Sequence, residues 1–155
     1  MWRKKVQITV RPARAEDFNY CADLYFSGME SIIRELKLDR PAQAASLRQE
    51  WESTQVRVIV LDAVDVGWFQ IIPHDDVLFL AQIFVDRPFQ GRGIGTEVMN
   101  CLIGEGARAG QAMALAVVKT NPALRLYRRL GFHITHEDDR KFYMRRDPDT
   151  GQQRP

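Results

Sequence analysis

The segment Gln90-Gly91-Arg92-Gly93-Ile94-Gly95 is the most informative stretch of this sequence. An apolar run precedes it and helical periodicity follows over residues 93–109, so the pattern predicts a glycine-rich turn between a strand and a helix. The first amides of a helix have no intrahelical partners, and glycines let a ligand approach the backbone closely. We therefore expect an anion-binding turn at a helix N-terminus, with positive charge from Arg92 at its rim.

Two familiar phosphate-binding motifs do not match this turn. A Walker A loop requires lysine and then serine or threonine after its last glycine, but Thr96-Glu97 follows Gly95. A dinucleotide-binding fingerprint requires G-x-G-x-x-G and an acidic residue at the end of the next strand. Here the turn is G-x-G-x-G, and the next predicted strand ends at Val118-Lys119. A Rossmann-type oxidoreductase is therefore only a minor alternative.

The remaining sequence predicts a mixed α/β fold. The expected order is β, α, α, β, β, β, α, β, α, β, β, with hairpins in the middle and a strand–helix–strand crossover around the glycine turn, so helices should cover both faces of one sheet. One apolar run, at residues 77–86, is typical of a central strand buried on both faces. The predicted strands are residues 7–14, 56–62, 67–73, 77–86, 112–118, 132–136 and 141–145, and the predicted helices are residues 17–37, 41–53, 93–109 and 121–131.

Helix ends and turns follow from individual residues. We expect Asp17 and Asn121 to be N-caps, and Gly110 to end the helix that follows the glycine turn. Turns are expected at residues 63–65, 74–76 and 137–139.

Composition restricts the class of protein. The 155 residues suit a single domain, which we place at residues 1–146, and the tail 147–155 has no apolar residue and is expected to be disordered. A formal net charge of +2 is too small to indicate nucleic acid or a membrane as a partner, and no apolar run is long enough to span a bilayer.

The two cysteines and the N-terminal residues indicate the cellular compartment of the protein. Cys21 and Cys101 lie in predicted helices, so we expect two buried, reduced thiols. The basic residues 1–5 are not followed by an apolar segment, as they would be in a signal peptide. Both features predict a cytoplasmic protein.

Two motifs resemble those of the GNAT superfamily of acetyltransferases. The first is Q/R-x-x-G-x-G/A between a strand and a helix, matched by residues 90–95 after the lead-in 83–89. The second contains an asparagine, a tyrosine and a final Gly-Phe pair, matched by Asn121, Tyr127 and Gly131-Phe132. The resemblance implies a mostly antiparallel sheet with a splayed, parallel pair of central strands. It also implies an N-acetyltransferase that uses acetyl-coenzyme A and no metal.

The resemblance covers residues 11–146 as element order and residues 80–132 as recognisable motif. It implies that the backbone of residues 83–85 pairs with the pantetheine arm and that the amides of residues 91–96 hold the pyrophosphate. Core packing explains the side chains of residues 83–85 equally well, and helix capping alone explains Asn121. The implied cofactor-binding residues are Ile83, Phe84, Val85, Gln90, Gly91, Arg92, Gly93, Ile94, Gly95, Thr96, Asn121 and Tyr127.

Tyr127 is the predicted general acid. The resemblance places a phenol beside the thiolate that leaves when an amine attacks the thioester, and a phenol can donate a proton or a hydrogen bond to it. Periodicity alone indicates a core aromatic residue, on an apolar stripe with Ala123 and Leu130. We favour the acid role because the second motif has a tyrosine at this point.

The sequence does not identify a general base. Many relatives use a glutamate on the central strand, but Gln82 stands near that position and can only orient a water or the substrate. Asp86 is a weak candidate that could equally be a cap, and Glu30, His74 and Asp76 are further candidates. The resemblance also allows direct attack by an amine that is already neutral, with a water chain in place of a side-chain base.

The sequence leaves an alternative function, the acceptor and the oligomeric state open. The missing glutamate leaves a catalytically silent acyl-coenzyme A sensor or accessory module as the alternative function. His133 and His136 lie near carboxylates, but we expect no metal site. The acceptor is an unidentified small-molecule or peptide amine. The family often forms homodimers, and the sequence names no interface.

Overall fold

The computed structural model describes residues 7–149 and has a mixed α/β fold. Seven strands follow the sheet order β1-β2-β3-β4-β5-β7-β6, in which β4 and β5 are parallel. The predicted mixed, mostly antiparallel sheet with a parallel central pair is confirmed. The strands are β1 (Thr9–Pro12), β2 (Val56–Leu61), β3 (Val64–His74), β4 (Val77–Val85), β5 (Ala112–Val118), β6 (His133–Glu137) and β7 (Lys141–Arg146). The α-helices are α1 (Phe18–Glu35), α2 (Arg40–Glu50), α3 (Ile94–Ala109) and α4 (Leu124–Arg129).

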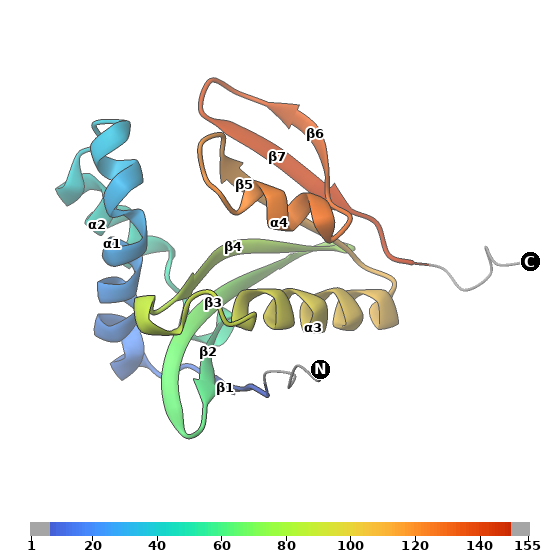
Figure 1. Ribbon diagram of the computed structural model, residues 1–155, viewed down its shortest axis with the longest axis horizontal. Coiled ribbons are helices and arrows are strands. Elements are labelled where there is room, and N and C mark those ends of the chain that lie inside the picture. Colours follow the sequence, from blue (N-terminus) through green and yellow to red (C-terminus); the bar gives the residue numbers. More distant parts are fainter. Residues whose placement is uncertain (1–6, 150–155) are drawn as a thin grey trace, which may run out of the picture. The chain divides into compact units, whose positions relative to one another are not determined.

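The chain divides into two compact units. Of the described residues, the first unit contains 7–70 and 82–95, and the second contains 71–81 and 96–149. The first unit therefore holds β1, β2, α1, α2 and the glycine turn, and the second holds β5, β6, β7, α4 and most of α3 (Figure 1). Strands β3 and β4 run through both units.

In the first unit, β1, β2 and the start of β3 form an antiparallel meander. Asp62-Ala63 joins β2 to β3, with left-handed φ angles of 51° and 65°, and Leu61 pairs with Val64 across it. The predicted turn at residues 63–65 is therefore placed slightly too late. Two-residue hairpin turns of this type usually carry glycine or asparagine, so alanine at the second position hid the signal.

Helix α1 begins where predicted, but not through the predicted cap. Asp17 occupies the N-cap position and makes no side-chain bond to the helix. Its carboxylate instead accepts the Arg14 amide at 2.8 Å and the Arg11 guanidinium at 3.0 Å. The Arg11 hydrogen bond is the main reason that the pKa of Asp17 lies below its ordinary value. Asp17 therefore links β1 to the start of α1.

Helix α2 begins after Asp39, whose carboxylate accepts the Ala42 amide at 3.0 Å, and it carries Pro41 in its first turn. Aspartate at the N-cap and proline in the first turn are favoured helix starts. The helix ends at Glu50, before the predicted end at residue 53.

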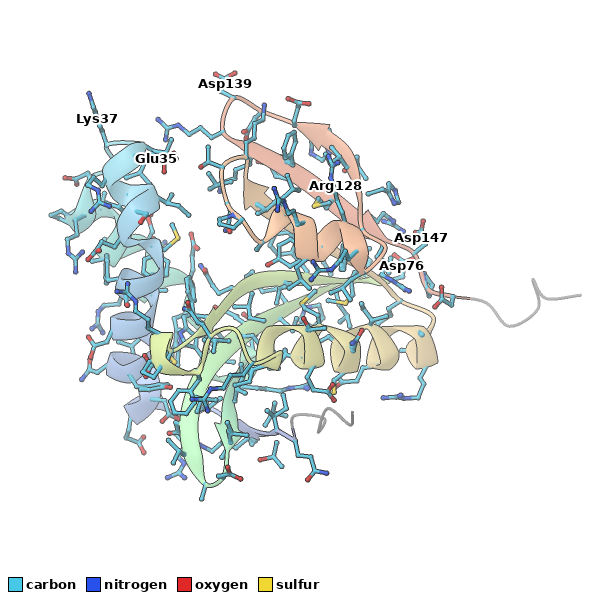
Figure 2. All side chains as sticks on the ribbon, in the orientation of Figure 1. Glu35, Lys37, Asp76, Arg128, Asp139 and Asp147 are labelled. Carbon is cyan, nitrogen blue, oxygen red and sulfur yellow. The ribbon has the colours of Figure 1, made fainter. Side chains whose placement is uncertain are left out.

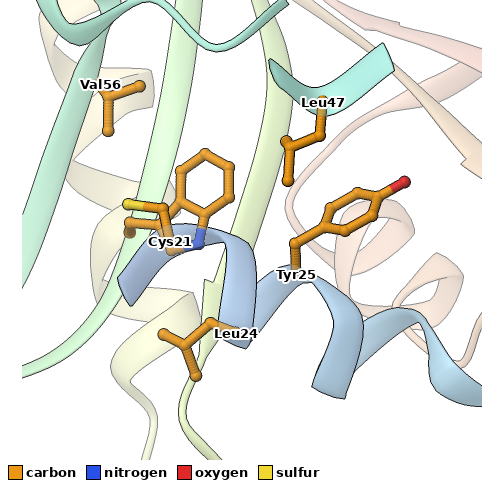
Figure 3. Close-up of a cluster of buried hydrophobic side chains, with 6 residues drawn as sticks. Cys21, Leu24, Tyr25, Leu47 and Val56 are labelled. Atoms are coloured by element: carbon orange, nitrogen blue, oxygen red, sulfur yellow. The ribbon is translucent and has the colours of Figure 1, made fainter. Parts of the chain in front are cut away.

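The core of the first unit combines side chains from both helices and from the sheet. Cys21, Leu24 and Tyr25 of α1 and Leu47 of α2 lie among these buried side chains (Figure 3). Val56 of β2 and Trp68 of β3 complete the cluster, and Trp68 has 0% exposure. Full burial of each large apolar side chain contributes about 1.5–3 kcal/mol, so this cluster anchors α1 on the sheet.

The second unit is built around β5. Residues 77–80 of β4 pair with residues 112–115 of β5 in parallel, and β7 pairs with β5 in the antiparallel sense. Strand β6 pairs with β7, with an irregularity between Ile134 and His136. Helix α3 ends before Gly110, which has a left-handed φ of 69°, as expected for a glycine C-cap.

Strand β4 is central in the sheet order, as predicted, but it is only half-buried. Leu80 alone among its residues is fully buried, so the expected burial on both faces is wrong. An apolar sequence does not distinguish a strand that is covered on both faces from one that is partly open.

Cys21 is buried and Cys101 is exposed, and both thiols are free. The expectation of two buried thiols is therefore wrong for Cys101, which lies on α3 within 4.0 Å of the Glu97 carboxylate. Membership of a helix does not by itself specify which face a residue occupies.

Within residues 7–149, no helix combines the length and the apolar character needed to cross a bilayer. The predictions for residues 1–5 and for the end of the tail, 150–155, lie outside the described residues. Asp147 lies just beyond β7 (Figure 2). Its carboxylate accepts a hydrogen bond from Arg145 at 2.8 Å.

Candidate active site

The glycine turn has the backbone that its sequence predicts. Gly91 and Gly93 have left-handed φ angles of 77° and 83°, and α3 begins directly afterwards at Ile94. Residues other than glycine rarely adopt such angles, because their Cβ then crowds the backbone. Two glycines are thus required by the shape of the turn that leads into the helix.

The surroundings of the turn leave room for a ligand. Apart from its chain neighbours and, for Gly95, the backbone of its own helix, a Cβ placed on Gly91 or Gly95 would meet no atom within 4 Å. The chain's own packing therefore does not fill the space beside these residues. The first amides of α3, which include those of Gly95 and Thr96, have no partners within the helix. Open space next to amides that lack partners within the helix fits a phosphate group.

Arg92 lies in the middle of the turn and is exposed. Its guanidinium carbon is 5.3 Å from the centre of the Phe89 ring, which holds the charge beside the turn. This position agrees with the expected positive charge at the rim.

The end of β4 is tied to the turn within the first unit. Asp86 follows β4, and its carboxylate accepts the Arg87 amide at 2.9 Å, which caps a short 3-10 helix. The side-chain amide of Gln90 donates to the Val85 carbonyl at 2.8 Å. Sequence reasoning missed this link, because a glutamine in a turn gives no indication of its partner.

Side chains from residues 83–85 are all half-buried. The Phe84 ring packs edge-on against Tyr25, with 5.5 Å between ring centres. Phe84 thus has a packing role, as the core interpretation expected. A ligand role for the backbone of these three residues stays a prediction.

Tyr127 belongs to the second unit, on α4. It is 7% exposed, and its ring lies 6.0 Å from that of Phe132 in an edge-to-face arrangement. Burial raises the pKa of the Tyr127 phenol above its ordinary value. The phenol therefore keeps its proton at neutral pH and can act as a donor.

Asn121 precedes α4 and accepts the Ala123 amide through its Oδ1 at 2.9 Å. The helix starts at Leu124 rather than directly after Asn121, and its N-cap position is Ala123. The prediction of Asn121 as the helix N-cap is therefore wrong; the Asn121 side chain closes the turn that precedes the helix. A contact with a cofactor stays a prediction.

The candidate bases differ in how far they are already engaged. Gln82 is half-buried, and the carboxylate of Asp86 already caps the 3-10 helix. Glu30 is exposed on α1, and His74 and Asp76 are exposed around the turn between β3 and β4. These positions do not single out a base.

No group of three or more metal-ligating side chains occurs in the part of the chain that the structure describes. His136 stacks on Tyr143, with 4.4 Å between ring centres and 1° between ring planes, and Thr135 Oγ1 lies 2.9 Å from its Nδ1. His136 is thus engaged in packing on the β6–β7 hairpin.

The sequence model of the acetyltransferase (GNAT) family matches residues 23–132. The chain belongs to this family. The matched region contains the glycine turn of the GNAT motif and the segment from Asn121 to Phe132. The resemblance noted in the sequence is therefore confirmed.

A curated relative is the uncharacterized N-acetyltransferase MJ1207 of Methanocaldococcus jannaschii, which is 36% identical over 72 residues. The match covers 45% of this chain and 32% of the relative, so the chain spans about a third of the length of that protein.

Solved structures share the fold. PH1933 from Pyrococcus horikoshii has a TM-score of 0.74 at 20% identity, covering 93% of this chain and 100% of that one. The PaiA N-acetyltransferase from Thermoplasma acidophilum, in complex with coenzyme A, has a TM-score of 0.65 at 16% identity, covering 91% and 99%. The ribosomal-protein-S18-alanine N-acetyltransferase from Escherichia coli has a TM-score of 0.66 at 17% identity, covering 94% and 97%.

Proposed function

We propose that this chain is an N-acetyltransferase that moves an acetyl group from acetyl-coenzyme A to an acceptor amine in a ternary complex. The observation that carries the proposal is the glycine turn, with two left-handed glycines at the start of α3 and open space beside it. Membership of the GNAT family supports the reaction class. The coenzyme A bound to the Thermoplasma acidophilum protein supports the choice of donor.

The turn would hold the pyrophosphate of the donor. Amides of residues 91–96 supply hydrogen-bond donors, and the start of α3 adds the positive end of its dipole. Each hydrogen bond to a charged group contributes about 1.5–3 kcal/mol. The backbone of residues 83–85 would pair with the pantetheine amides, and Asn121 would contact the same arm. The side chain of Gln90 joins the glycine turn to residues 83–85 through the Val85 carbonyl.

Acetyl-coenzyme A supplies a thioester carbonyl that a neutral amine can attack. In the balanced reaction, the new N–C bond forms, the C–S bond breaks, the amine loses a proton and the departing sulfur gains one. Tyr127 would hold a proton at its Oη and donate it, or a hydrogen bond, to that sulfur. Its raised pKa keeps this proton in place at neutral pH.

An amine that binds in its neutral form still loses one proton after it attacks the thioester. A water can accept that proton and return it to Tyr127 after the phenol has protonated the sulfur, so no side-chain base is required. Gln82 would orient a water or the acceptor through its amide. Asp86 is the weaker candidate for a base, because its carboxylate already accepts the Arg87 amide. We therefore expect activity to rise with pH as the acceptor amine loses its charge.

The test is release of free thiol from acetyl-coenzyme A in the presence of a panel of amines: amino acids, polyamines, drug-like amines and peptide N-termini. The proposal predicts amine-dependent release and an acetylated acceptor by mass spectrometry. If coenzyme A binds but no amine in the panel triggers release, the silent sensor or accessory module becomes the better account, consistent with glutamine at position 82.

A further inference from the structure

Phe84 is half-buried and packs against the core cluster of the first unit. Its ring centre lies 5.5 Å from that of Tyr25 and 5.6 Å from that of Trp68. Both neighbours are buried, with exposed fractions of 6% and 0%. Protein cores are close-packed, so the Phe84 ring cannot shift toward either neighbour without displacing it.

Gly28 of α1 contacts the same ring. A Cβ on Gly28 would lie 2.6 Å from Cδ1 and 2.8 Å from Cε1 of Phe84, well inside the roughly 3.5 Å at which carbon atoms pack. The φ angle of Gly28 is not left-handed, so alanine could adopt its backbone. Glycine in a helix costs about 0.5–1 kcal/mol relative to alanine. The contact with Phe84 is therefore what requires glycine here.

Gly67 of β3 makes a similar contact with the backbone of β4. A Cβ on Gly67 would overlap the carbonyl oxygen of Phe84 and lie 3.2 Å from Cα of Val85. Glycine within a strand commonly marks such a close approach of another backbone. Gly28 thus accommodates the ring, and Gly67 accommodates the main chain, of one short segment.

The residues that follow are tied down as well. The Asp86 amide donates to the Val66 carbonyl at 2.8 Å, and the Gln90 side chain holds the Val85 carbonyl. The end of β4 therefore has a fixed position relative to the glycine turn, because both belong to the first unit.

We propose that Gly28 and Gly67 are positioning residues for binding of the acyl donor. By leaving room for Phe84, they place the backbone of residues 83–85 where it can pair with the donor while the turn holds the pyrophosphate. The identity of the ligand rests on the proposed function, whereas the contacts of Gly28 and Gly67 are within the chain itself. The close contacts of Gly28 are with the Phe84 ring, and those of Gly67 include the backbone of Phe84 and Val85, so both glycines would act through this segment.

The experiment measures the Kd for coenzyme A by calorimetry, together with amide chemical shifts of Val85 and Asp86 in the free protein. The variants are Gly28→Ala, Phe84→Val and Gly28→Ala with Phe84→Val. Valine removes the two ring atoms that a Cβ at position 28 would strike. Gly104→Ala in α3 is the matched control, because its Cβ would meet only the Arg108 side chain, at 3.5 Å.

Gly28→Ala should raise the Kd about 10-fold or more and shift the Val85 and Asp86 amides, whereas Gly104→Ala should do neither. The double variant should have the same Kd and the same amide shifts as Phe84→Val alone. This comparison tests the contact between position 28 and the Phe84 ring even if Gly28→Ala alone does not fold. An unchanged Kd in folded Gly28→Ala, or equal harm with and without Phe84, would overturn the inference. If the wild type does not bind coenzyme A, the proposed function fails, and the amide shifts still test the packing.

Discussion

Replacing Gly93 by alanine separates the ligand role of the glycine turn from its conformational role. Gly93 has a φ of 83°, and Gly110 at the other end of α3 has a φ of 69°. Alanine in this region costs about 1–2 kcal/mol. Both Gly93→Ala and Gly110→Ala should therefore lose similar stability, with an unfolding midpoint lower by roughly 2–8 °C for a chain of this size.

Only Gly93→Ala should lose affinity for coenzyme A. A backbone that relaxes away from the left-handed region turns at least one amide from the phosphate, and one such hydrogen bond contributes about 1.5–3 kcal/mol. The Kd should rise by about 10- to 150-fold. Calorimetric titration of both variants below their unfolding midpoints measures this. Equal affinities for the two variants, whether both normal or both weakened, would refute the assignment of the phosphate to this turn.

Three further predictions follow from individual groups. Tyr127→Phe should lower turnover by about 10- to 1,000-fold with little change in the Kd for coenzyme A; an unchanged rate would remove Tyr127 from the mechanism. In the native protein a thiol reagent should modify exposed Cys101 and spare Cys21, whose pKa is raised to about 12 by burial, and modification of Cys21 before unfolding would contradict the packing of α1. The pKa of Asp17 is lower in the folded protein than its ordinary value of 3.8, so the ionised carboxylate stabilises the fold above pH 3.8 and this stabilisation is lost as the pH falls through the lower, folded value. Asp17→Asn should therefore make the free energy of unfolding depend less on pH in acid. An unchanged dependence would show that the Arg11 contact contributes nothing.

The order of the α-helices and strands was predictable from the sequence, because turn-forming residues and the periodicity of apolar residues indicated the same elements. Gly93 and Gly110, which flank α3, indicated both the glycine turn and the length of the helix. Errors arose where the residue type does not show which partner or which face a side chain takes. Asp17 reads as a helix cap, but Arg11 and the Arg14 amide hold its carboxylate. Cys101 lies in a helix, but on an exposed face.

The candidate site was predictable only where the backbone needs a special residue. Glycines at positions 91 and 93 mark the turn because left-handed φ angles need them. Gly28 and Gly67 give the same kind of signal, yet their reason is contact with Phe84, which no local pattern reveals. The base and the acceptor have no comparable signal, because an amide at position 82 and exposed charges on α1 fit many chemistries.

An amide-resolved NMR titration of this chain with coenzyme A tests directly whether the glycine turn holds the pyrophosphate of the donor. Saturable shifts should be largest at residues 91–96 and at residues 83–85. NADH at the same concentrations should leave these amides unchanged. An absence of saturable shifts, or shifts concentrated away from the glycine turn, would show that the turn is not the donor site.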